Sequence, residues 1–100
     1  MRSHEKIMNI IQESYQRLFP GNKSLYTYGL EYNRRLSPFN ANIRRYGNTI
    51  QVNLNLQWKD IDQEIKIGLI QHLLLKILKT KGHTQNIDLY HHFVKNIPLL

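Results

Sequence analysis

His72 and Lys76 stand four residues apart in a long apolar stretch, a spacing that places two side chains on one face of a helix. Two histidines at that spacing can bind one zinc ion, and a glutamate directly after the first can take a proton from the metal-bound water. Here Leu73 follows His72, and Lys76 takes the place of the second imidazole. Because leucine is no base and a lysine ammonium repels a cation, we expect neither a catalytic zinc ion nor peptidase activity at this helix.

Other side chains do not complete a catalytic site in its place. Three more histidines follow in the chain: His83, His91 and His92. Neither His83 nor His92 is spaced from His72 in a way that predicts a shared metal ion, and no pair of carboxylates is placed for acid–base chemistry. The absence of cysteine excludes disulfides and thiolate metal sites. We therefore expect no catalytic residue, metal or cofactor, while a metallopeptidase with an atypical zinc site remains an alternative.

The charge of the chain points to its partners. Fourteen lysines and arginines stand against seven acidic residues, so the formal net charge is +7. A basic surface favours polyanions, which include nucleic acid, ribonucleoprotein and acidic protein surfaces. No apolar run approaches the ~18 residues of a membrane span, and the first residues lack the apolar core of a signal peptide. We expect a cytoplasmic protein that has no membrane partner.

Basic side chains among tyrosines are the best candidates for binding a polyanion. They are Lys23, Arg34, Arg35, Arg44, Arg45 and Tyr46. Arginine binds phosphate through two hydrogen bonds, and an exposed tyrosine can stack on an unpaired base. In a strand, Arg44 and Tyr46 share one face and Arg45 lies on the other. Alternatively, the arginine pairs are solvated charges that keep strand edges from aggregating.

A second basic set surrounds the histidine of the long apolar helix. It consists of Lys76, Lys79, Lys81 and Lys95. These side chains would make a groove near His72 suited to anions, since lysine is a compact positive charge.

Hydrophobic periodicity predicts three helices and three strands. The helices are expected at residues 3–19, 61–80 and 87–96, and the strands at residues 25–32, 40–46 and 49–56. The expected helix caps are Ser3, either Asp60 or Asp62, and Asn86. Gly47-Asn48 is the expected hairpin turn. The order of elements predicts one α+β domain over residues 1–100, an N-terminal helix followed by a small three-stranded antiparallel sheet and two helices.

This order, together with several local strings, resembles the SprT-like branch of the gluzincin-type zinc peptidases, which have a zincin-like fold. The strings are Leu18-Phe19-Pro20, residues 32–36, residues 46–54, residues 64–78 and Tyr90-His91-His92-Phe93. The resemblance implies that residues 64–78 correspond to the active-site helix of that family. It also implies which positions held the zinc ligands and the base: His72, Leu73, Lys76 and Leu89. One ligand of three remains, so the resemblance implies a pseudo-metallopeptidase.

The charge leaves such a domain a binding role. We expect a non-catalytic module that binds a macromolecule, foremost nucleic acid or ribonucleoprotein. The SprT-like family includes members that act on DNA-bound proteins, which agrees by analogy. The alternative is a protein-interaction module that pairs a peptide or partner along the strand at residues 49–56, because active relatives hold their substrates at such an edge.

Overall fold

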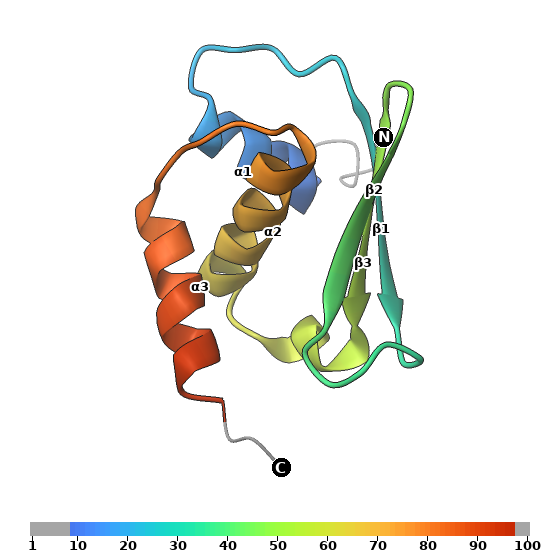
Figure 1. Cartoon of the computed structure of the whole chain (residues 1–100), viewed down its shortest axis with the longest axis vertical. Helices are drawn as coiled ribbons and strands as arrows, with labels where there is room; N and C mark the ends of the chain where they lie inside the picture. Colours follow the sequence, from blue (N-terminus) through green and yellow to red (C-terminus); the bar gives the residue numbers. More distant parts are fainter. Residues whose placement is uncertain (1–8, 98–100) are drawn as a thin grey trace, which may run out of the picture.

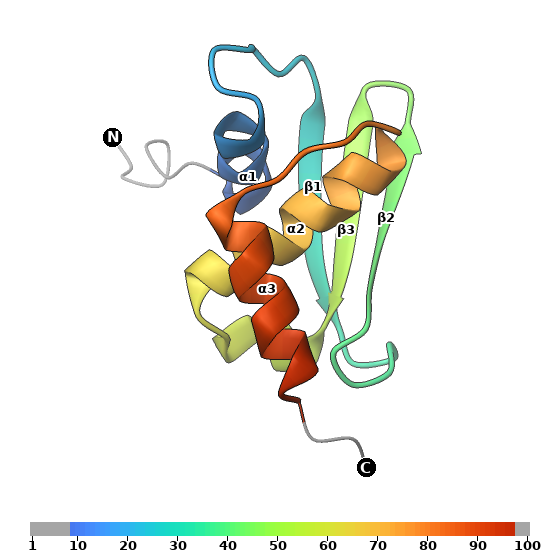
Figure 2. The same ribbon diagram turned by 60° about the vertical axis from the view of Figure 1, so that its left-hand side comes forward.

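The chain has an α+β architecture, as its sequence predicts (Figure 1). The computed structural model describes residues 9–97. The elements are α1 (Ile10–Leu18), β1 (Thr27–Asn33), β2 (Ala41–Tyr46), β3 (Thr49–Asn55), the short 3₁₀ helix η2 (Leu56–Asp60), α2 (Gln63–Ile77) and α3 (Gln85–Lys95). All three helices lie on one side of the sheet, with α2 between the sheet and α3 (Figure 2). Among the described residues, no helix is both long and apolar enough to cross a bilayer.

The sheet is mixed, so the prediction of a fully antiparallel sheet is wrong for its first strand. β2 and β3 form the expected antiparallel hairpin around Gly47-Asn48, where Gly47 has φ +57°. β1 instead pairs with β3 in parallel, and the strand order is β1-β3-β2. The connection at residues 34–40 takes the chain to β2, which does not pair with β1. The position between these two strands is filled by β3, which runs parallel to β1.

The central position of β3 also overturns the proposed binding edge at residues 49–56. The backbone of β3 pairs with β1 on one side and with β2 on the other. A partner strand has no hydrogen-bonding edge to join there, because edge pairing needs unpaired N–H and C=O groups. The free edges of this sheet belong to β1 and β2.

The core lies between the sheet and α2. Ile50, Val52 and Leu54 alternate along β3 and are completely buried, as their period of two predicts. They pack with side chains of α2 and α1, among them Ile70, Leu74 and Ile11, and with Trp58 of η2. Leu73 also belongs to this core. The leucine that follows His72 therefore serves packing, as expected for a position that lacks a catalytic base.

The helix caps differ in part from those predicted. Asp62 caps α2 by accepting a hydrogen bond from the backbone N–H of Glu64. Asn9 caps α1, which begins at Ile10, and the predicted cap Ser3 lies outside the described residues. Thr84 caps α3 in place of Asn86. The side chain of Asn86 is used otherwise, since it donates to the carbonyl oxygen and the carboxylate of Glu64.

Candidate functional site

His72 faces α3, where it meets two rings. Its ring centroid lies 5.4 Å from that of Tyr90 and 5.5 Å from that of His91. Burial lowers the pKa of His72, and the neighbouring Lys76 and His91 lower it further. His72 is therefore a half-buried histidine whose surroundings favour the neutral form, with positive charge next to it.

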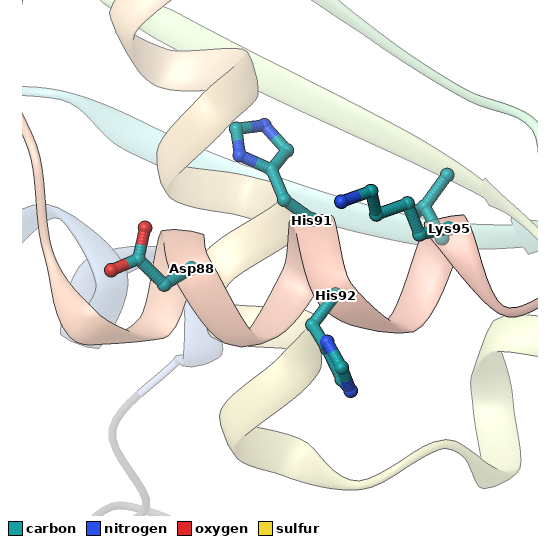
Figure 3. Close-up of a pocket in the computed structure, with 5 residues that line it drawn as sticks. Asp88, His91, His92 and Lys95 are labelled. Carbon is teal, nitrogen blue, oxygen red and sulfur yellow. The ribbon is translucent and has the colours of Figure 1, made fainter.

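The remaining described histidines do not build a metal site with His72, although His91 approaches it. His91 and His92 point to opposite sides of α3 (Figure 3). They line an open depression of about 460 Å³ with Asp88, Val94 and Lys95. His83 lies 2.9 Å from both carboxylate oxygens of Asp88. Within residues 9–97, no three His, Cys, Asp or Glu side chains come together in a way that could hold a metal ion.

The position that the SprT-like resemblance assigns to a third zinc ligand also lies apart from His72. Leu89 is 47% exposed on the surface of α3. The side chains that meet His72 come instead from Tyr90 and His91. The sequence missed the approach of His91 because it does not show how α3 is rotated against α2.

Positive charge gathers at one end of the molecule, which we call the basic end. Three connections lie at this end in both views: residues 19–26, the β2–β3 hairpin and residues 78–84 (Figure 1, Figure 2). The segments 19–26, 44–50 and 75–84 contain no aspartate or glutamate. They contribute the six cations that define the basic end: Lys23, Arg44, Arg45, Lys76, Lys79 and Lys81.

Contacts within the described residues tie these segments together. The N–H of Thr27 donates to the carbonyl oxygen of Asn48 in the hairpin at 2.8 Å. The guanidinium of Arg45 lies over the ring of Tyr26, 5.1 Å from its centroid, and donates to the carbonyl oxygen of Gly47. Gly82 lies against side chains of α1 and α2, so residues 78–84 stay close to the body of the domain. The basic end is thus a connected surface.

The two arginines of β2 point to opposite faces of the sheet, as predicted. Arg45 pairs across β3 with the buried Ile50 and therefore lies on the helix side. Arg44 lies on the other side and donates to the hydroxyl of Tyr46 at 3.4 Å. Tyr46 is 58% exposed. The hairpin therefore presents cations on both faces of the sheet.

The structure does not bring all the predicted basic residues together. Arg34 and Arg35 follow the carboxyl end of β1, and Tyr46 ends β2 at the opposite end of the sheet. A strand of seven residues separates the two ends by about 20 Å. Lys95 ends α3, at the far end of this helix from residues 78–84 (Figure 1). The arginine pairs are consequently two separate surfaces.

Lys79 has a backbone conformation that is unusual for lysine. Its φ is +56°, in the left-handed region that favours glycine. This residue follows the C-cap Leu78, where many helices have glycine. The helix expected over residues 61–80 would run through Lys79, whereas α2 ends at Ile77. Glycine would fit the backbone of residue 79 better than lysine does.

No protein-family model, curated protein or solved structure matches this chain.

Proposed function

We propose that this protein is a non-catalytic module that binds nucleic acid or ribonucleoprotein through the basic end. The observation that carries the proposal is the gathering of six cations at one end of the fold, in three segments that are distant in the sequence and contain no carboxylate. Such a surface attracts a phosphate backbone and releases the counterions bound to it. The left-handed Lys79 adds support, because strained backbone is concentrated at functional positions.

The proposal includes a relationship to SprT-like domains in which the catalytic centre is lost. It is supported by the order of a helix, a small sheet and two helices, and by the place of His72 on the first helix after the sheet. Lys76 beside His72 argues against a metal ion at this position, since both would be positive. A binding role is compatible with these features, whereas hydrolysis has no evident base.

Fluorescence anisotropy with labelled RNA and DNA, at low and moderate salt, tests the proposal. We expect binding that weakens steeply as salt increases. Exchanging Lys79→Glu together with Lys81→Glu should weaken binding at least about tenfold. The slope of log K against log salt concentration should also become shallower by about one for each phosphate contact that is lost. The matched control is Arg34→Glu with Arg35→Glu, the same change of charge at the other end of the sheet.

Lys79→Gly separates binding from folding. This exchange removes one cation and relieves the left-handed backbone, so thermal stability should be kept or raised while binding weakens. Binding that does not depend on salt, or that falls equally with the control pair, would show that the basic end is not the binding surface.

A further inference from the structure

The face of the sheet that turns away from the helices is polar. No described helix or strand covers it (Figure 1, Figure 2). Cross-strand pairing places Gly29, Gln51 and Arg44 in one row on this face. We call it the open face and define it by Gly29, Asn42, Arg44, Tyr46, Gln51 and Asn53. In contrast to the other side of β3, it presents amides, an arginine and an aromatic ring, together with the carboxylate of Glu31.

The amides of the open face form a hydrogen-bonded row that runs along β3 and then crosses to β2. Gln51 donates to Asn53 at 3.1 Å, and Asn53 donates in turn to Asn42 at 2.9 Å. Amide groups have both donors and acceptors, so they can bind the edges of unpaired bases. Such edges are already occupied when bases are paired in a duplex.

Gly29 keeps this face flat. A Cβ at residue 29 would stand 2.3 Å from Oε1 of Gln51, so the glutamine amide lies in the space that any other side chain would need. The amide consequently extends toward β1 and does not stand up from the sheet. A flat polar surface next to an exposed ring suits a planar base.

Tyr46 and Arg44 join the open face to the basic end. Arg44 belongs to both surfaces, and Tyr46 beside it has an accessible ring. Stacking on an aromatic ring and pairing of phosphate with arginine are the two contacts that bind single strands. Glu31 lies in the row of Asn53 and Asn42. Its carboxylate repels phosphate, which directs the backbone of a bound strand toward the basic end.

We infer that the open face binds unpaired bases, so that the preferred ligand is single-stranded nucleic acid. This inference rests on the proposed function, because the basic end supplies the attraction for phosphate. A base stacks on Tyr46, neighbouring bases contact the amide row, and the backbone passes Arg44 toward the cations of the hairpin. Duplexes contact the basic end alone and therefore bind more weakly.

Anisotropy titrations with the full chain test the inference. The probes are a U-rich RNA and a T-rich DNA of about ten nucleotides, and each of them annealed to its complement. We expect at least one single strand to bind about tenfold tighter than its duplex. Tyr46→Ala should remove most of this preference without changing the salt dependence, since no charge is lost. Tyr46→Phe keeps the ring and should retain the preference.

The outcomes separate the inference from the proposed function. Equal binding of single strands and duplexes, or unchanged single-strand binding in Tyr46→Ala, would overturn the role of the open face and leave the basic end as the binding surface. Absence of binding to every probe at low salt would overturn both. Tighter binding of a single strand than of its duplex supports the inference, and the probe that shows it, RNA or DNA, identifies which single strand the face selects.

Discussion

The carbonyl oxygen of Asn86 on α3 occupies the space above Gly68 on α2. A Cβ built on Gly68 would stand 1.8 Å from this oxygen, so the two helices touch through their backbones. Gly68→Ala normally favours a helix by about 1 kcal/mol. Here the added methyl group would clash with the backbone of Asn86, which is rigid. We therefore expect a net loss of about 3 kcal/mol in the free energy of unfolding, measured by chemical denaturation.

Gly82→Ala is the control for this exchange. The nearest atoms to its Cβ would be the methyl groups of Leu75 and Leu18, at 3.2 and 3.4 Å, which can move slightly. We expect a change of less than about 1 kcal/mol. Equal effects of the two exchanges would show that close packing of α2 against α3 is not what requires Gly68.

Asn55 holds the connection between β1 and β2 in place. Its buried side chain accepts hydrogen bonds from the N–H groups of Phe39 and Gln57, and it donates to the carbonyl oxygen of Leu36. Asn55→Ala leaves these backbone groups without their partner, and each such group costs about 1–3 kcal/mol when it remains buried. We expect a loss near 3 kcal/mol in total, measured by urea denaturation.

Asn33 provides the comparison, because it is the cross-strand neighbour of Asn55. Its side chain accepts one exposed hydrogen bond from the N–H of Arg35. Asn33→Ala should therefore cost less than about 1 kcal/mol. A similar cost for both exchanges would refute the special role of Asn55.

Thr84 combines a helix cap with a link to α2. Its hydroxyl accepts from the N–H of Ile87 and donates to the side chain of Gln71, which in turn donates to the carbonyl oxygen of Ser14. Thr84→Ala should destabilise the protein by about 1–2 kcal/mol. Thr84→Ser retains the hydroxyl and should recover most of the loss. If the serine variant is as unstable as the alanine variant in thermal unfolding, the hydroxyl is not the cause.

The lowered pKa of His72 makes stability depend on pH. Burial, Lys76 and His91 favour neutral His72 in the folded protein, whereas the unfolded chain has the usual pKa near 6.5. The contribution of neutral His72 to the free energy of unfolding is therefore fully present above pH 6.5. It is lost as the pH falls through the lower pKa of the folded protein. Proton NMR titration of His72 measures this pKa. Lys76→Met should raise it toward 6.5, while a pKa at or above 6.5 in the unchanged protein would contradict the prediction.

The sequence predicts where the helices and strands of this fold lie along the chain better than it predicts which of them pack or pair with each other. Alternation along β3 and the turn residues Gly47 and Asn48 predict the hairpin, because both signals are local. The partner of β1 depends on the path of residues 34–40 and leaves no periodic signal. For this reason β3 was placed at an edge in the prediction, although it is the central strand.

The same distinction applies to the candidate site. Alternation in β2 predicts that Arg44 and Arg45 lie on opposite faces, which the strand register confirms. The sequence does not predict that residues 78–84 lie at the same end of the molecule as the hairpin, since this depends on how α2 crosses the sheet. Arg34 and Arg35 were grouped with the hairpin arginines from sequence, but the direction of β1 takes them to the other end.

From the parallel pairing of β1 we expect the sheet to fold in an early and a late step. β2 and β3 are joined by a two-residue turn and can pair within about 1–10 μs, whereas β1 must first close a long loop to reach β3. Until β1 docks, one edge of β3 is open beside the apolar side chains of Ile50 and Val52. An open apolar edge is where chains associate wrongly. We therefore expect slower docking of β1 to leave more of the newly made protein open to aggregation.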